Sequence, residues 1–391
     1  MLRLLHTADV HLGARHADLG DQAVAQRERQ LAAFVATVDL AIFEHVDVVL
    51  IAGDLFDSNV QPRRSVDRVA SELRRLVDAR IRTVIIPGTH DVYDRSSIYR
   101  AYDLKTLAGS SANDDLVTVL TPDRAWVRLG ACDVVVHGRV FDTKRAPHSP
   151  LRDLAPAPDE GATWRVGMVH GSIAIPTKTD RDEVVITPDE IAATKLDYLA
   201  LGHWHSVQQG KAGGVTYGYS GAPEPVAVDQ DRAGKVLLVT LDGDPTSRSV
   251  VVEERQVGRT LFDKVEVDAG KLTDAPTLIA ELQQRADPDL ILDVRLAGVR
   301  HDDLDLDLDQ VEAALAASFL KVRVRDASVA ALTEGPLPSA ETIVGSFIRD
   351  LEGRIGELEA AGGDARTAQA AELRDVLRLG RLLLAGHGVT L

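Results

Sequence analysis

A set of aspartates and histidines in the first part of the chain has the composition of a binding site for two metal ions. Its members follow short aliphatic runs, such as residues 2–5 before Asp9 and residues 48–51 before Asp54. Such runs followed by polar loops are typical of buried strands whose loops carry function. In an open α/β sheet, ligands collect beyond the carboxyl ends of the strands. The sequence therefore predicts one shared site built from seven residues: Asp9, His11, Asp54, His90, His170, His203 and His205.

Two pairs within this set are separated by a single residue, Asp9 with His11 and His203 with His205. In extended backbone, alternate side chains point to the same side, so both members of a pair can face one centre. The mixture of imidazole and carboxylate suits manganese, iron or zinc, whereas an all-oxygen set suits magnesium or calcium. Two metals about 3.5–4 Å apart can hold the attacking and leaving oxygens of a displacement at phosphorus. One carboxylate has to bridge them, and Asp54 is the candidate.

Five motifs in this chain, taken in order, resemble those of the calcineurin-like metallophosphoesterases. The motifs are Asp9-x-His11, Gly53-Asp54, Gly88-x-His90-Asp91, His170 and Gly202-His203-x-His205. Residues 6–13 and 53–57 are similar, more narrowly, to the SbcD-type nuclease subunits of bacterial double-strand-break repair. The resemblance implies an α/β fold of the four-layer metallophosphoesterase type, in which two packed mixed sheets are flanked by helices. It also implies a hydrolase, a dinuclear-metal phosphodiesterase or DNA exonuclease.

The resemblance also implies a role for each site residue. One metal ion would be held by Asp9, His11, Asp54 and His205. The second would be held by Asp54, Thr89, His170 and His203. His90 would stabilise charge on the phosphate or protonate the leaving oxygen, with Asp91 as its orienting partner; such an acid contributes about 10²–10⁴ in rate. The two divalent ions are expected to be Mn²⁺, with iron or zinc as alternatives.

Thr89 departs from the family pattern, which has asparagine before the histidine. A threonine hydroxyl is a shorter and poorer metal donor than an amide oxygen, so we expect the second metal to bind more weakly or through water. Two neighbours of the motifs are open to structural explanations. Trp204 is expected to pack rather than to stack on a base, and Asp57 suits either a turn or a role in orienting a ligand.

The composition is that of an intracellular enzyme. The chain has 391 residues and a single cysteine, Cys132, which excludes an intramolecular disulfide framework. The sequence passes from Met1 directly into the first apolar run, which leaves no room for a signal peptide, and no run has the length of a membrane span. We therefore expect a soluble, cytoplasmic protein with no membrane association.

The charge pattern bears on nucleic-acid binding. A net charge of -16 argues against a generic nucleic-acid binder, because lysine and arginine make the phosphate contacts. Residues 263–309 hold thirteen acidic and five basic residues. Seven arginines gather instead in and around one apparent helix, where a solvated helix face is favoured over a track for DNA: Arg63, Arg64, Arg68, Arg74, Arg75, Arg80 and Arg82.

Three domains are expected: a catalytic domain at 1–258, a small α/β cap at 259–332, and a linker with a helical hairpin at 333–391. In the first, helices are expected at 24–44 and 65–79, and residues 187–190 form a capping box. The second follows a strand, helix, strand, helix, strand pattern. In the third, Ser339 is expected to cap a helix whose apolar stripe starts at Ile343. The equivalent region of SbcD-type proteins binds the coiled-coil base of an SbcC-type ATPase, which favours partner binding here.

The sequence thus predicts a manganese-dependent nuclease, an exonuclease with endonuclease action also open, that processes DNA ends in double-strand-break repair with an SbcC-type ATPase. Two alternatives stay open. One is a phosphodiesterase or phosphatase for small molecules, since the same metal pair hydrolyses many phosphate esters. The other is a weakly active protein that docks DNA ends, because Thr89 replaces asparagine. Whether the chain forms a homodimer is also left open.

Overall fold

The computed structural model describes residues 1–111, 114–143, 149–152, 154, 161–174, 184–227, 230, 232–244, 247–301, 304, 306–330, 338–362 and 364–384. The chain divides into two compact units, Met1–Leu261 and Phe262–Leu391. The expected linker around residues 334–337 lies outside the described residues, so the finer division into three domains stays a prediction.

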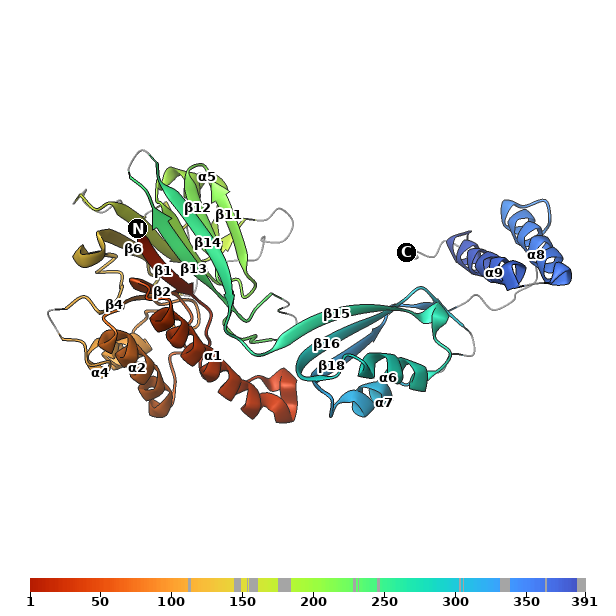
Figure 1. The fold of residues 1–391 in the computed structure, drawn as a ribbon, viewed down its shortest axis with the longest axis horizontal. Coiled ribbons are helices and arrows are strands. Elements are labelled where there is room, and N and C mark those ends of the chain that lie inside the picture. The colour runs from red at the N-terminus through yellow and green to blue at the C-terminus, as the bar shows by residue number, and fades with distance from the viewer. Residues whose placement is uncertain are drawn as a thin grey trace. The chain divides into compact units, whose positions relative to one another are not determined.

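The first unit contains two six-stranded mixed sheets (Figure 1). The first sheet has the order β14-β13-β1-β2-β3-β4, with bounds β14 Ser249–Gln256, β13 Lys235–Asp242, β1 Leu2–Thr7, β2 Val48–Ala52, β3 Arg82–Ile86 and β4 Val117–Val119. The second has the order β11-β12-β10-β7-β6-β5, with bounds β11 Gln208–Ala212, β12 Val215–Tyr219, β10 Tyr198–Gly202, β7 Trp164–His170, β6 Val134–Arg139 and β5 Trp126–Leu129. Strands β1 to β4 are parallel to one another, as are β7 and β10.

The two sheets pack face to face. Leu4 and Leu50 of the first sheet lie in one buried cluster with Val166 and Tyr198 of the second. Helices α1 (Ala23–Phe43) and α2 (Arg63–Asp78) cover the other face of the first sheet through residues such as Phe34. On the second sheet, α5 (Pro188–Ala193) contributes to the outer cluster. The result is a four-layer sandwich, which confirms the predicted fold class.

Helix α2 owes its position to a single apolar stripe. Its buried residues recur every three or four positions: Val66, Val69, Ala70, Leu73 and Leu76. Its opposite face carries several of the arginines considered above as a DNA track, and acidic neighbours already pair with them. Arg63 lies 2.8 Å from Asp67, and Arg75 lies 2.6 Å from Glu72. Such pairing favours a solvated helix face.

Short elements connect these layers. Helices α3 (Ile98–Ala101) and α4 (Leu104–Leu107) follow β3, and strands β8 (Ser172–Ile173) and β9 (Val185–Ile186) pair after β7. The predicted capping box at the start of α5 is present, because the Thr187 hydroxyl accepts from Glu190 N at 3.2 Å while the Glu190 carboxylate accepts from Thr187 N at 2.9 Å. Short 3-10 helices lie at Ala17–Gln22, Gly130–Cys132 and Ala269–Lys271.

The second unit begins with a three-stranded sheet ordered β15-β16-β18. Its elements are β15 (Leu261–Asp268), α6 (Ala275–Gln283), β16 (Asp287–Ala297), α7 (Leu308–Leu315) and β18 (Phe319–Asp326), which match the expected strand and helix order. A small parallel pair, β17 (Val299–Arg300) and β19 (Val329–Ala330), accompanies them. Leu278, Leu292 and Val311 lie in one cluster with Val322, so both helices share the core of this sheet.

The hairpin consists of α8 (Ile343–Ala361) and α9 (Asp364–Leu384). The prediction that Ser339 caps α8 was wrong, because the Thr342 hydroxyl accepts from Gly345 N at 3.0 Å and starts the helix three residues later. Ile343 lies outside the buried stripe and is 81% exposed, whereas Ile348, Leu351 and Ile355 are buried. Among the described residues, no helix is both long and apolar enough to span a membrane.

Candidate metal centre

The predicted ligands lie at the carboxyl ends of two pairs of parallel strands. Asp9 and His11 follow β1 and Asp54 follows β2, while His170 ends β7 and His203 follows β10. Several hydrogen bonds hold these ends together. Asp9 N donates to Gly53 O at 3.1 Å within the first sheet, and His170 Nδ1 donates to Ala52 O at 3.0 Å across the sandwich. The fold therefore brings strand ends far apart in sequence to one place.

Several of these residues have backbone conformations that side chains rarely adopt. The φ angles are 53° at Asp9, 50° at His11, 52° at Asp54 and 102° at His203. Positive φ is uncommon outside glycine, and such residues cluster at functional sites, where the surrounding structure holds the strain of about 1–3 kcal/mol each. Here the left-handed turns redirect the chain immediately after each strand, so the side chains remain at the strand ends.

Two glycines of the motifs allow the strand ends to approach this closely. A Cβ atom at Gly53, whose φ is +95°, would lie 2.2 Å from His170 Nδ1. A Cβ atom at Gly88 would lie 2.2 Å from Asp54 Oδ1. Both positions need a residue without a side chain, because these distances are far shorter than van der Waals contact.

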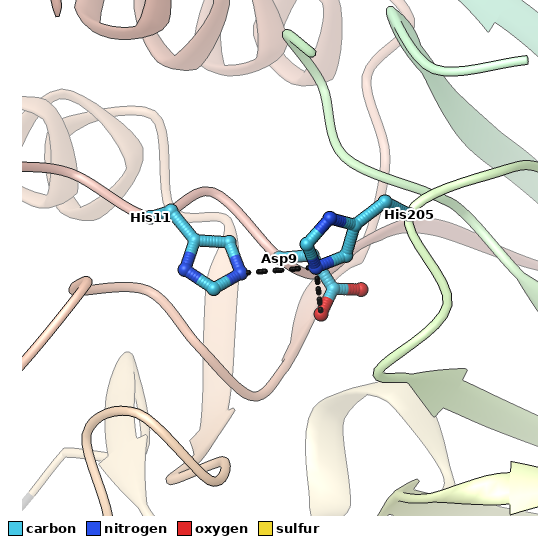
Figure 2. A group of neighbouring side chains, drawn as sticks. All are labelled: Asp9, His11 and His205. Carbon is cyan, nitrogen blue, oxygen red and sulfur yellow. Dashed lines mark hydrogen bonds and ion pairs between the residues drawn. The ribbon is translucent and has the colours of Figure 1, made fainter. Parts of the chain in front are cut away.

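A first group of candidate ligands joins Asp9, His11 and His205 (Figure 2). His11 Nε2 lies 3.2 Å from His205 Nε2, which in turn lies 3.9 Å from Asp9 Oδ1. Their ligand atoms are all within 4.8 Å of one another. Asp9 is fully buried, and both of its carboxylate oxygens accept from His203 N, at 3.0 and 3.1 Å. These contacts place a carboxylate and two imidazoles around one point.

A second group joins Asp9, Asp54 and His170. His170 Nε2 lies 3.1 Å from Asp54 Oδ2 and 4.0 Å from Asp9 Oδ1. Asp54 Oδ2 is also 3.8 Å from His11 Nε2, so this carboxylate lies near a histidine of each group, and its bridging role stays a prediction. Asp9, rather than Asp54, is the residue that belongs to both groups, which the sequence did not indicate.

The electrostatics of this cluster suit a cation. Burial lowers the pKa of His170, but the Asp54 and Asp9 carboxylates outweigh it and raise that pKa to about 10. Burial raises the pKa of Asp54, but His170 and His11 hold it well below its usual range. His170 Nδ1 donates to a carbonyl, so its buried Nε2 faces the carboxylates, and it makes no hydrogen bond of good geometry among the described residues. The residues present therefore fit a divalent metal ion.

Two of the predicted ligands lie at the edge of this arrangement. Thr89 Oγ1 donates to Asp54 Oδ2 at 3.4 Å, so its hydroxyl does reach the candidate bridging carboxylate. The His203 ring lies 5.3 Å from the His170 ring at an interplanar angle of 83°. His203 belongs to none of the three groups of close histidine and carboxylate atoms found among the described residues, the third of which joins His11, Asp57 and His90. The roles of Thr89 and His203 as ligands stay predictions.

His90 and Asp91 are neighbours in sequence but point into different surroundings. The His90 side chain is 49% exposed, and its Nδ1 lies 3.1 Å from the Asp57 carbonyl oxygen. Asp91 is fully buried and accepts from Gly88 N at 2.7 Å, Phe56 N at 3.2 Å and the Tyr99 hydroxyl at 2.6 Å. Burial and the nearby Asp54 raise the pKa of Asp91. These contacts fix the loop that carries His90, which differs from the direct orienting role expected from sequence.

Two further residues contact the predicted ligands. Asp57 Oδ1 lies 3.3 Å from His11 Nδ1, which favours the ligand-orienting explanation over a turn alone. The Gln230 side-chain amide lies against His205 Nδ1, and its oxygen accepts from Val226 N at 2.8 Å. Gln230 was missed because it stands in a loop without a motif. Both contacts come from loops rather than from strand ends.

The surface beside the second strand pair is hollowed. A cavity of about 400 Å³ is lined by His203, Trp204, His205, Ser206 and Gln230. Trp204 stacks on Tyr219 with ring centroids 4.9 Å apart, and its Nε1 donates to Ser172 at 2.9 Å. The expected packing role of Trp204 thus agrees with its contacts.

Known proteins have sequences similar to this region of the chain. The calcineurin-like phosphoesterase family matches residues 2–207. The DNA double-strand break repair protein Mre11 of Aeropyrum pernix is 29% identical over 279 residues, which cover 69% of this chain but only 64% of that protein. The SbcD component of the nuclease SbcCD from Rhodobacter capsulatus is 27% identical over 328 residues, covering 74% of this chain and 77% of that protein. The uncharacterized metallophosphoesterase YhaO of Bacillus subtilis is 24% identical over 293 residues, covering 73% and 67%.

The family match therefore takes in more than half of the 391 residues, and it includes all three groups of close ligand atoms found among the described residues. The positive-φ turns and the glycine contacts that assemble these groups lie within the same segment. On this basis the chain belongs to the calcineurin-like phosphoesterase family.

Proposed function

We propose that this protein is a metal-dependent phosphodiesterase that cleaves DNA at its ends and works with a coiled-coil ATPase of the SbcC type. The observation that carries the proposal is the convergence of two buried carboxylates, Asp9 and Asp54, with His11, His170 and His205 at one sandwich edge. The names of the Aeropyrum and Rhodobacter relatives support DNA as the substrate class.

Asp9, His11, Asp54 and His205 would hold one divalent ion, and Asp54, Thr89, His170 and His203 would hold the other. When bound, such ions supply positive charge that stabilises the charge building up on a phosphate ester. Manganese is our choice because the ligand set mixes imidazole and carboxylate. His90 would protonate the leaving oxygen. Its Nδ1 donates to the Asp57 carbonyl, so Nε2 is the ring nitrogen that can deliver a proton to substrate.

The helical hairpin is the proposed contact for the ATPase. Ile343 is 81% exposed, Val376 48% and Leu383 49%, so both of its helices present apolar side chains to solvent. Large exposed apolar side chains that gather on one element often mark a protein interface. A homodimer is a further proposal. The exposed side chains of the hairpin are available for contact with the ATPase or with a second copy of the chain.

The first experiment is degradation of end-labelled linear duplex DNA with Mn²⁺. We expect the natural protein to release label and Asp54→Ala to be inactive, because removal of the carboxylate takes a ligand from the middle of the cluster. Asp67→Asn on the exposed face of α2 is the matched control and should keep full activity. An equally active Asp54→Ala would refute the proposal. Cleavage of a small phosphate ester without cleavage of DNA would favour a small-molecule phosphodiesterase.

Thr89 gives specific support to a second candidate, a weakly active protein that docks DNA ends. Its hydroxyl donates to Asp54 Oδ2 at 3.4 Å, so it can satisfy this carboxylate without a second metal ion. If this candidate is right, Thr89→Asn should raise both Mn²⁺ stoichiometry, measured by elemental analysis, and the cleavage rate. An unchanged metal content and rate in Thr89→Asn would count against it.

A further inference from the structure

The His205 ring has a polar contact at each of its two nitrogens. Nδ1 accepts a hydrogen bond from the side-chain amide nitrogen of Gln230. Nε2, the nitrogen that faces Asp9, lies 3.2 Å from His11 Nε2 (Figure 2). The backbone of His205 is held as well, because its carbonyl oxygen accepts from Ala222 N at 2.9 Å. Any change in how this ring bonds therefore involves its neighbours Gln230 and His11.

The orientation of the Gln230 amide follows from its other contact. Its oxygen Oε1 accepts from Val226 N at 2.8 Å, and a backbone N–H can only donate. The oxygen is thus on the Val226 side, and the NH2 group faces His205. Val226 is itself held in place, because its carbonyl oxygen accepts from Nδ1 of the buried His16 at 3.2 Å. Rotating the amide by half a turn would place two donors, the NH2 group and Val226 N, against each other.

This orientation determines which nitrogen of a neutral His205 ring carries the proton. A neutral imidazole has one N–H donor and one acceptor nitrogen. Because Nδ1 accepts from Gln230, the proton is on Nε2, where it can be donated to His11 Nε2. The Asp57 carboxylate lies 3.3 Å from His11 Nδ1, which favours a proton there and leaves His11 Nε2 as the acceptor. The two candidate ligands therefore bond to each other, in a series of donors and acceptors that starts at Val226 N.

A metal ion held by Asp9, His11 and His205 needs the opposite arrangement. A histidine binds a metal through a nitrogen without a proton, and its other ring nitrogen then donates to an acceptor. For His205 the proton would have to be on Nδ1, where it would meet the NH2 group of Gln230, which is also a donor. Metal binding therefore replaces the bond between His11 and His205. It also requires Gln230 either to move away or to turn its oxygen toward His205, which ends its bond with Val226.

We propose that Gln230 is a positioning residue that favours the direct bond between His205 and His11 over a metal ion at these ligands, and that metal binding releases Val226 N from the amide. The inference deepens the proposed function and rests on it, since it concerns the same metal-dependent site. A carboxylate at position 230 would have the opposite effect. Its oxygens only accept, so they could bond to Val226 N and to a proton on His205 Nδ1 at the same time.

The first test is Mn²⁺ affinity, measured by equilibrium dialysis on the full chain. We expect Gln230→Glu to bind Mn²⁺ about 10–100-fold more tightly than the natural protein, the usual effect of an acceptor that orients a histidine ligand. Gln230→Ala removes the NH2 group without adding charge and should also bind more tightly. Gln284→Glu, which adds the same charge at an exposed position at the end of α6, is the control and should bind like the natural protein.

The Ala variant separates this inference from a simple effect of charge. Equal or weaker binding in Gln230→Ala would overturn the inference, because any gain in Gln230→Glu would then come from the added negative charge alone. Unchanged affinity in Gln230→Glu would overturn it as well, since the carboxylate offers His205 Nδ1 the acceptor that the amide withholds.

The second test follows the backbone amide of Val226 by hydrogen exchange, read by mass spectrometry with fragmentation of the peptides. In the natural protein we expect exchange at this amide to become faster when Mn²⁺ is added, because the amide loses its acceptor. In Gln230→Glu the amide should stay protected with and without Mn²⁺. Slower or unchanged exchange at Val226 in the natural protein would contradict the proposed release.

The design also distinguishes failure of this inference from failure of the proposed function. If the natural protein binds Mn²⁺ but releases no label from duplex DNA, the proposed function fails, while the affinities and the exchange at Val226 still decide the role of Gln230. If neither the natural protein nor Gln230→Glu binds Mn²⁺, the inference fails together with the metal site.

Discussion

The site residues differ in how much of each side chain water can reach, and this separates their functions. The side chains of Asp9, His11, Asp54 and His170 are at most 2% exposed, whereas that of His90 is 49% exposed. Groups that hold a cation gain from a water-poor site, because electrostatic interactions are stronger there. A group that hands a proton to a macromolecular substrate has to be reachable. His90 is therefore expected to meet the substrate rather than the metals.

His90→Ala should accordingly lower kcat by about 10²–10⁴-fold, the usual contribution of a positioned acid. Mn²⁺ binding should stay within about twofold of the natural value, because the side chain is not part of the Asp9 or Asp54 groups. Elemental analysis of the dialysed protein and turnover on duplex DNA measure the two quantities separately. Loss of metal together with activity would instead place His90 among the ligands.

The sequence predicted which residues gather but not how each one is used. Asp9, His11, Asp54 and His170 could be placed together because each follows an apolar run that ends in a polar loop. The contacts of Asp91 could not be predicted, since a single turn decides whether its side chain meets His90 or the buried amides of Phe56 and Gly88. Gln230 lies 25 positions from His205 in a loop of no recognisable pattern, so only the folded chain reveals its contact.

At the scale of elements, the loop after β3 has to pass directly beside the loop after β2. Gly88 permits this, because the nearest atoms to a Cβ built there are Asp54 Oδ1 at 2.2 Å and Asp54 N at 2.6 Å. The second of these atoms is backbone and cannot rotate away. The two loops are further joined where Thr89 and His90 donate to the Asp54 carboxylate.

Gly88→Ala should therefore displace Asp54 and reduce Mn²⁺ binding at least tenfold while the two sheets stay intact. Gly130→Ala is the matched control, because a Cβ at that glycine has no heavy atom within 4 Å. Equilibrium dialysis gives the metal affinity, and far-ultraviolet circular dichroism checks that both variants keep their secondary structure. Natural affinity in a folded Gly88→Ala protein would disprove the close approach of the two loops.

Element positions were largely predictable because each buries one regular stripe or run. Residues 24–44 were expected to be helical and Ala23–Phe43 are, since the apolar residues of that segment face the first sheet. The start of α8 was not predictable in this way. Ser339 and Thr342 are both good capping residues, and only the hydrogen bond from Gly345 N to the Thr342 hydroxyl decides between them. The pairing of two sheets into a sandwich depends on contacts between distant strands, and it was predicted from the family resemblance rather than from any stripe.

At the scale of the whole molecule, a net charge of -16 has to coexist with a site for phosphate. The arginines of α2 do not resolve this, because Arg63, Arg68 and Arg75 already pair with acidic neighbours. Two buried carboxylates at the candidate centre add further negative charge. Bound divalent ions would reverse the local sign, since they are the largest charges in such a site. Metal binding is therefore expected to be a condition for substrate binding as well as for catalysis.

The same charge balance gives a prediction for stability. The groups of close ligand atoms found among the described residues all lie in the unit Met1–Leu261. Without a cation, that unit buries Asp9 and Asp54 near each other, whereas a bound ion would neutralise them. A ligand that binds only the folded state stabilises it by about 2.7 kcal/mol at a concentration 100 times its Kd.

Scanning calorimetry of the whole protein after chelation should therefore show a transition that moves to higher temperature when Mn²⁺ is added. The shift should be smaller with Ca²⁺ at the same concentration, because imidazole ligands suit manganese better than calcium. Asp54→Ala changes the buried charge and therefore also the unfolding temperature without Mn²⁺. The quantity to compare is thus the Mn²⁺-dependent shift of each protein, and we expect this shift to vanish in Asp54→Ala. An equal shift in Asp54→Ala would mean that the stabilising ion binds elsewhere in the molecule.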